Sequence, residues 1–317
     1  SLLAQPMKTV PAAELGKASR VIVAQEQYSG FCAGHVASPL AIKELKIVVD
    51  CANGATYQVA PLVFSKLGLN PIFKASSPDG LNINKDCGST NLGFLRAKMA
   101  REKADIGIAF DGDGDRVCLV DHQGSIIDGD DILYLLAIDL LERGEEFGGV
   151  VGTHMTNMAF ELAFRDKGIP FFRADVGDRN VIRAMKERGW LLGGEGSGHI
   201  LNLKKTNTGD GLITALQILE IIDRKKKSLA QIGNTVPKYP QILKNIRCRD
   251  PESLLENHSF CSEINSCRGR LGERGRILVR KSGTEPLVRL MVEGQNMQEI
   301  ESIGGHLESV AVSIRQF

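Results

Sequence analysis

Short apolar runs alternate with helix-like segments through most of the chain, and this alternation limits the folds available to it. Residues 45–50 predict a buried strand, residues 55–67 a helix, and residues 70–73 the start of a second strand. Residues 92–103 predict another helix, and a strand over 104–110 follows it. Strands that alternate with helices favour a largely parallel sheet covered on both faces, so we predict an α/β domain here.

A second series of the same kind follows residue 124 and predicts a second α/β domain with a mixed, largely parallel sheet. Pro237 and Pro240 interrupt this pattern, so we place a domain boundary near residue 238. The helices are predicted over 130–142, 157–167, 179–188 and 212–223, and the strands over 149–152 and 169–173, with 190–194 leading into a glycine-rich loop.

The last part of the chain predicts a small antiparallel α+β domain. Its strands are predicted over 241–248, 275–280 and 286–293, and its helices over 251–261 and 297–313. The chain begins with Ser1 rather than methionine, so we expect a piece of a longer protein. Residues 1–23 are predicted to be a linker left from a preceding domain, and residues 15–23 could be the end of a helix. The predicted domains cover residues 24–123, 124–238 and 239–317.

Composition and charge exclude several classes of partner. The 317 residues are 43% hydrophobic and 24% charged, with a net charge of +1, so we expect no nucleic acid or membrane partner. No apolar stretch reaches membrane-spanning length, and we expect no signal peptide before the first domain. The seven cysteines include no CxxC pair, which favours reduced thiols and a cytoplasmic protein.

Three aspartates alternate with glycines between the strand that ends at residue 110 and an apolar run over 117–120. Asp111, Asp113 and Asp115 repel one another unless a cation cancels their charge, and Mg²⁺ prefers such carboxylate oxygens. The alternative is a solvated acidic turn, which we consider weaker for three aspartates followed by an arginine. An EF-hand is excluded, because its sixth and twelfth positions would hold Arg116 and His122.

Two arginines flank a tight loop near the C-terminus. Arg280 and Arg289 offer forked guanidinium groups, and the loop between them adds the hydroxyls of Ser282 and Thr284 and the backbone of Gly283. This combination suits a phosphate dianion. The alternative is a basic hairpin turn without a ligand, and the spacing fits neither a Walker A loop nor a nucleophile elbow.

A glycine-rich segment over 193–199 predicts close approach of a loop to a ligand. Glu195 can accept hydrogen bonds from two neighbouring sugar hydroxyls, and Ser197 and His199 can add polar contacts. A flexible glycine turn is an equally good interpretation of this segment alone. Two further polar turns, Gly177 with Asp178 and residues 207–211, precede helices, so helix capping is as good an interpretation as ligand contact.

Taken together, these segments resemble the α-D-phosphohexomutase family. Residues 78–84 and 87–90 are typical of its branch that acts on glucosamine phosphates. Family members carry a phosphorylated serine in a preceding domain, in a T-A-S-H-N-P-like loop, and this sequence contains no such loop. The segments that carry the resemblance are DGDGDR at 111–116, GEGSGH at 194–199, and RKSGTEP at 280–286 with Arg289.

The resemblance implies an isomerase that interconverts glucosamine 6-phosphate and glucosamine 1-phosphate through a phosphoserine and a bisphosphate. Without the serine loop, we expect this chain alone to be inactive. Phosphomannomutase or phosphoglucomutase activity, an aspartate-dependent phosphatase and a non-catalytic sugar-phosphate-binding module remain alternatives, and a homodimer stays open. The implied roles are Mg²⁺ binding by Asp111, Asp113 and Asp115, catalysis by Arg116 and His199, and substrate binding by Gly177, Asp178, Glu195, Ser197, Arg280, Ser282, Gly283, Thr284 and Arg289.

Overall fold

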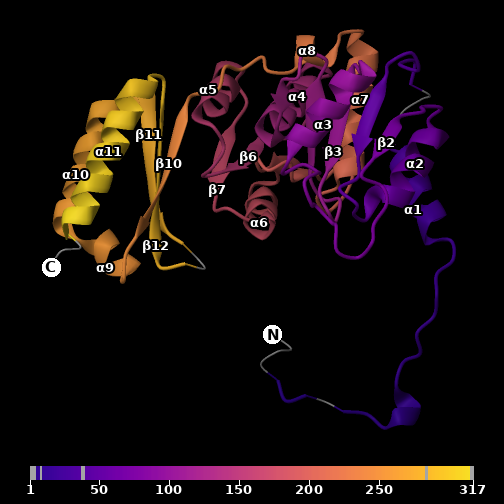
Figure 1. Ribbon diagram of the computed structural model, residues 1–317, viewed down its shortest axis with the longest axis horizontal. Coiled ribbons are helices and arrows are strands. Elements are labelled where there is room, and N and C mark those ends of the chain that lie inside the picture. Colours follow the sequence, from indigo (N-terminus) through magenta and orange to yellow (C-terminus); the bar gives the residue numbers. More distant parts are fainter. Residues whose placement is uncertain (1–4, 8, 37–39, 283–284, 315–317) are drawn as a thin grey trace.

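The computed structural model describes residues 5–7, 9–36, 40–282 and 285–314 and contains three sheets in a row (Figure 1). The sheets follow one another in chain order, each with its own helices, and the segment before residue 24 extends away from them. Two α/β units and a small antiparallel α+β unit confirm the predicted fold class.

The first sheet has the strand order β2-β1-β3-β4-β5. Strands β1, β2 and β3 are parallel; β1 and β3 are buried, whereas β2 at the edge is half-buried. Strand β4 runs antiparallel to β3, and β5 runs antiparallel to β4. Helix α3 covers one face through Leu95 and Met99, and α2 packs on the core of the other face. The elements are α1 (Ala24–Ala33), β1 (Ile47–Asp50), α2 (Thr56–Lys66), β2 (Ile72–Lys74), α3 (Leu92–Glu102), β3 (Ile106–Phe110), β4 (Val117–Asp121) and β5 (Ile126–Ile127).

The second sheet has the order β7-β6-β8-β9, in which only β9 is antiparallel. Helices α4 and α7 pack against each other and are buried along most of their length, so their apolar residues join the cores of the first and second sheets. The elements are α4 (Gly129–Glu142), β6 (Val150–Thr153), α5 (Met158–Asp166), β7 (Phe171–Ala174), α6 (Asp178–Arg188), β8 (Leu192–Gly194), β9 (Ile200–Asn202), α7 (Gly211–Lys225) and α8 (Leu229–Ile232).

The third sheet is antiparallel, with the order β10-β12-β11. Helices α10 and α11 cover one face with an apolar core of their own, and the other face is turned toward the second unit (Figure 1). The elements are β10 (Gln241–Arg247), α9 (Pro251–Glu256), α10 (His258–Leu271), β11 (Gly275–Lys281), β12 (Leu287–Gly294) and α11 (Met297–Ile314).

Two expectations about helices are wrong. Residues 15–23 are not the end of a helix: a short 3₁₀ turn over Ala12–Glu14 precedes them, and α1 begins only at Ala24. The helix expected over 251–261 is two helices, because Asn257 is extended between them and its side chain accepts a hydrogen bond from the backbone N–H of Phe260. A capping asparagine starts a new helix there, and that helix continues to Leu271.

Two further features concern the length of the helices and the state of the cysteines. Within the described ranges, the helices are all too short or too polar to cross a membrane. The seven cysteines are free thiols, and Cys51 and Cys118 are buried at the strands where we expected them.

Candidate functional site

The three aspartates lie in the turn that connects β3 to β4. One carboxylate oxygen from each of Asp111, Asp113 and Asp115 falls within 4.8 Å of the others. Asp111 is buried, and its Oδ1 accepts hydrogen bonds from the backbone N–H groups of Gly114 (3.2 Å) and Arg116 (3.1 Å). These bonds fold the turn back on its first residue, so the three side chains converge.

Glycines make this close turn feasible. The carbonyl of Gly112 accepts a hydrogen bond from the N–H of Ala55 (2.8 Å), and a Cβ on Gly54 would stand only 2.1 Å from the same oxygen. Gly114 has a φ of +80°, which only glycine adopts without strain. The turn is therefore clamped against the start of α2, and an alanine at residue 54 would push it away.

The charge in this turn is only partly balanced. Burial raises the pKa of Asp111 to about 6; the hydrogen bond from the N–H of Arg116 opposes the rise, and the charge of Asp115 adds to it. The Nε of Arg116 lies 3.6 Å from Asp111 Oδ2 and 3.7 Å from Asp115 Oδ1. Buried Asp115 Oδ1 has no hydrogen-bond partner among the described residues. Three converging carboxylates with such an oxygen fit a hard divalent cation.

The aspartate turn is joined to the glycine-rich loop through His199. The Nδ1 of His199 lies 2.9 Å from Asp115 Oδ2, and the backbone of Val117 donates to the carbonyl of Gly198 (3.1 Å). His199 is buried, and Gly209 lies so close to its imidazole that a Cβ there would come within 2.3 Å of the ring. The contacts of His199 thus suit positioning of Asp115, and its expected role as a general acid or base stays a prediction.

Glu195 and Ser197 line a pocket of about 370 Å³ between the second and third units. Glu195 Oε1 accepts a hydrogen bond from the backbone N–H of Gly177 (2.7 Å), and Ser197 Oγ lies 3.4 Å from Glu195 Oε2. The structure thus brings two of the separate sequence signals together. Asp178 lies in the first turn of α6 and contacts the N–H of Arg179, outside the residues that line this pocket.

The two arginines lie directly opposite each other, Arg280 on β11 and Arg289 on β12. They line a second pocket, of about 240 Å³, on the sheet face turned toward the second unit. Arg289 Nε and Ser282 Oγ are buried without a hydrogen-bond partner in the described part of the chain, as expected for donors aimed at a ligand. Gly283 and Thr284 lie outside the described residues.

Several pocket residues were missed by sequence reasoning. Met155 lines both pockets, so the pocket of Glu195 and Ser197 adjoins the pocket of the two arginines. Asn245 lies opposite Arg289 across β10 and β12, and Asp130 and Lys238 line the larger of the two pockets. Met155 carried no sequence signal, because only the packing of β10–β12 against the loop after β6 gives it this place.

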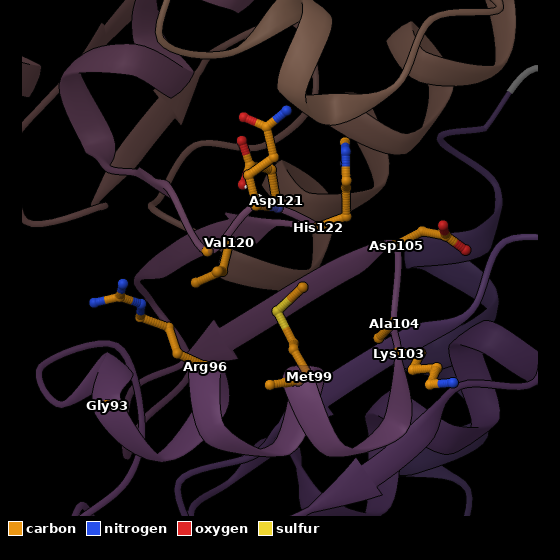
Figure 2. A pocket seen from close by; sticks show the side chains of 12 residues that line it. Gly93, Arg96, Met99, Lys103, Ala104, Asp105, Val120, Asp121 and His122 are labelled. Carbon is orange, nitrogen blue, oxygen red and sulfur yellow. Dashed lines mark hydrogen bonds between the residues drawn. The ribbon is translucent and has the colours of Figure 1, made fainter.

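A third pocket, of about 720 Å³, lies on the first unit (Figure 2). Its walls include Arg96, Asp105 and His122, at the end of the sheet opposite the aspartate turn. Asp121 is the buried carboxylate there, and it already accepts hydrogen bonds from the N–H groups of Gln123 and Ser125. None of the predicted site residues lines this pocket, so its size does not make it the candidate site.

Three family models match the chain in succession. Residues 27–124 match the phosphoglucomutase/phosphomannomutase alpha/beta/alpha domain II, residues 128–239 match domain III, and residues 243–305 match the C-terminal domain. The three matched stretches follow the three sheets in order, and only β5 and the first two residues of β10 fall outside them.

Curated relatives and solved structures agree with these matches. The chain is 48% identical over 313 residues to a phosphoglucosamine mutase of Pseudomonas fluorescens, covering 99% of this chain and 70% of that protein. It is 49% identical over 302 residues to one of Cronobacter sakazakii, covering 94% of this chain and 67% of that protein.

The fold is similar to two solved structures. A phosphoglucomutase/phosphomannomutase family protein of Burkholderia thailandensis has a TM-score of 0.75 at 26% identity, over 90% of this chain and 64% of that one. An Aspergillus fumigatus N-acetylphosphoglucosamine mutase, solved with GlcNAc-6P and magnesium, has a TM-score of 0.73 at 19% identity, over 91% and 70%. With the fold, the three domain matches and these relatives in agreement, the chain belongs to the phosphoglucomutase/phosphomannomutase family, the α-D-phosphohexomutases.

Proposed function

We propose that this chain supplies the metal, sugar and phosphate sites of a phosphoglucosamine mutase, an isomerase that interconverts glucosamine 6-phosphate and glucosamine 1-phosphate. One observation carries the proposal: Met155 lines both the pocket of Glu195 and the pocket of Arg280 and Arg289. A carboxylate suited to hydroxyls thus lies beside arginines suited to a phosphate dianion, which is the chemistry of a sugar phosphate. The curated relatives named phosphoglucosamine mutase support this choice over the mannose and glucose mutases.

Asp111, Asp113 and Asp115 would hold Mg²⁺. When bound, the ion would stabilise negative charge on a phosphoryl group in transfer. The side chain of Arg116 lies beside the same carboxylates, so we assign it to stabilising the same charge. His199 would hold Asp115 in place through the contact at its Nδ1.

The remaining residues would bind the substrate without discriminating its two orientations. Glu195, with Gly177 and Ser197 beside it, would accept hydrogen bonds from ring hydroxyls. Arg280, Ser282 and Arg289 would hold the phosphate that does not react, whichever end of the sugar carries it. We extend this phosphate role to Gly283 and Thr284, and a further substrate contact to Asp178, on the family resemblance alone.

The domain division is part of the same proposal. We assign the metal site to residues 24–123, the sugar site to 124–238 and the phosphate site to 239–317. Taken alone, the chain would be a sugar-phosphate-binding module, because the T-A-S-H-N-P-like loop of the family is not in this sequence. The phosphoryl donor would come from outside it.

Calorimetric titration of this chain with glucosamine 6-phosphate and with inorganic phosphate tests the proposal. Arg289→Ala should weaken binding of both ligands roughly tenfold or more, because it removes charge-assisted hydrogen bonds to phosphate. Glu195→Gln keeps the shape of the side chain but loses its charge. It should therefore weaken the binding of the sugar phosphate and leave the affinity for inorganic phosphate nearly unchanged.

Arg270→Ala on α10, away from both pockets, is the matched control and should change neither affinity. If Glu195→Gln lowered the affinities for glucosamine 6-phosphate and inorganic phosphate equally, the assignment of its loop to the sugar would be contradicted. Unchanged affinities in Arg289→Ala would contradict the phosphate site.

A further inference from the structure

We propose that Asp130 recognises the ammonium group of the amino sugar and so sets the preference for glucosamine phosphates over glucose phosphates. This inference rests on the proposed function and names a residue for its substrate specificity. Asp130 is the second residue of α4 and lines the pocket that also contains Glu195 and Ser197.

Only one of the two carboxylate oxygens of Asp130 has a hydrogen-bond donor in the described part of the chain. Its side chain is only 6% exposed. Oδ2 accepts a hydrogen bond from the backbone N–H of Asn157 (2.9 Å), whereas buried Oδ1 has no partner in the described part of the chain. A buried acceptor without a donor costs free energy, so its presence in a binding pocket points to a donor that arrives with the ligand.

The lysine that lines the same pocket already contacts two other carboxylates. Lys238 Nζ lies 2.7 Å from Asp128 Oδ2 and 2.6 Å from Asp131 Oδ2. Among the ion pairs of the described residues, none includes Asp130. The pocket thus contains two carboxylates, Asp130 and Glu195, that form no ion pair with a lysine or arginine of the described chain. A ligand with one positive charge and several hydroxyls complements such a wall, and a neutral sugar does so less well.

The electrostatic cost of this arrangement supports a role in binding. Burial raises the pKa of Asp130 to about 7; the charge of Asp128 adds to the rise, and the N–H of Asn157 and the charge of Lys238 oppose it. Near neutral pH the carboxyl group of Asp130 in the free protein is therefore only partly ionised. An ammonium group next to it would favour the carboxylate form.

Gly196 lies against this carboxylate and lines the same pocket. A Cβ at this position would lie 3.4 Å from Asp130 Oδ2 and 3.5 Å from Oδ1, in van der Waals contact with both oxygens. Gly196 does not have the positive φ that would restrict it to glycine. An alanine there would therefore fit the backbone and place a methyl group between the pocket and the carboxylate.

Titration calorimetry of this chain with three ligands tests the proposal. The ligands are glucosamine 6-phosphate, glucose 6-phosphate, and N-acetylglucosamine 6-phosphate, which is neutral where glucosamine is charged. The unmodified chain should bind glucosamine 6-phosphate about tenfold or more tightly than the other two, because a charge-assisted hydrogen bond exceeds a neutral one. Asp130→Asn should remove that preference and leave the affinity for glucose 6-phosphate within about twofold.

Two further variants separate recognition from structure. Gly196→Ala, which keeps every charge, should also reduce the preference. Asp139→Asn changes a carboxylate of the same helix that is equally buried, 5% exposed, and paired with Arg143 and Arg224 away from the pocket. It should leave the ligand preference unchanged even where it lowers the thermal stability.

The outcomes distinguish this inference from the proposed function. If the unmodified chain binds glucosamine and glucose 6-phosphates equally, the role of Asp130 is overturned while sugar-phosphate binding stands. If Asp130→Asn weakens all three ligands to the same extent, Asp130 supports the pocket and recognises no ammonium group. If none of the three sugar phosphates binds, the proposed function itself fails.

Discussion

At the scale of single residues, Asp113 offers the simplest test of the metal site. It is the exposed member of the three aspartates, so its removal should cost the fold little. We expect Mg²⁺ to raise the melting temperature of this chain and Asp113→Ala to abolish the increase, because ligand binding to the folded state stabilises it. Thermal denaturation with and without Mg²⁺ measures both. Asp166→Ala, an exposed carboxylate at the end of α5, is the control, and an equal Mg²⁺ response in Asp113→Ala would place the metal elsewhere.

The charge of Asp130 makes a prediction about stability and pH. Its pKa rises from an ordinary value of 3.8 to about 7 in the folded chain, so between these values the folded state binds the proton that the unfolded state has released. The free energy of unfolding should therefore fall as pH rises through this range, by about 1.4 kcal/mol for each pH unit at most.

Asp130→Asn cannot lose this proton. Its stability relative to the unmodified chain should rise from about pH 4 to pH 7 and then stay constant, as measured by urea denaturation at several pH values. A stability difference that does not depend on pH would show that Asp130 titrates at its ordinary pKa. Asp139→Asn, measured in parallel, reports the effect of losing a buried carboxylate that has arginine partners.

At the scale of elements, β11 and β12 fasten the third sheet to the second unit. Glu293 of β12 is completely buried and accepts hydrogen bonds from Arg276, from Gln241 (2.9 Å) and from the backbone N–H of Met158 (3.0 Å). Arg276 also donates to the carbonyls of His154 (2.8 Å) and Thr156 (2.7 Å). The strands that carry Arg280 and Arg289 are thus tied to the loop that carries Met155.

Breaking this connection should be costly. Glu293→Ala leaves Arg276 partly buried without its carboxylate, and removing one partner of a buried ion pair costs about 3–5 kcal/mol. We expect a marked fall in the midpoint of urea denaturation and weaker binding of sugar phosphates. Glu273→Ala, an exposed carboxylate in the turn before β11, is the control. A midpoint that matches the control would mean that the two units are held by other contacts.

Contacts between neighbours in the sequence could be predicted, whereas contacts between distant segments could not. The aspartate turn could be predicted because its residues are neighbours in the chain and its flanking strands are apolar. For Asp130 the sequence predicts only the start of a helix, because its contacts with Asn157 and Gly196 join segments far apart in the sequence. The place of Met155 depends on how two units pack, and a local pattern contains no information on that packing. The residue roles that we propose remain predictions.

At the scale of the whole molecule, the three predicted sites lie along one path. The aspartate turn contacts the glycine-rich loop through Asp115 and His199, and that loop lines the pocket that Met155 joins to the arginines. The path runs past all three sheets, so in the proposed function each unit would supply one part of the chemistry. The family's phosphorylated serine would have to reach the aspartate end of this path, because that is where the metal would stabilise the transferring group.

The last prediction concerns turnover by the whole chain. We assign to the chain binding groups for metal, sugar and phosphate, but its sequence contains no T-A-S-H-N-P-like loop to donate a phosphoryl group. We expect it to bind glucosamine 6-phosphate and not to convert it to glucosamine 1-phosphate, even with Mg²⁺ and a glucosamine bisphosphate present. ³¹P NMR resolves the two esters and also reveals free phosphate, which the alternative aspartate-dependent phosphatase would release. Sustained isomerisation by the pure chain would mean that its own residues supply the nucleophile, and Asp111 and Asp113 would be the first to substitute.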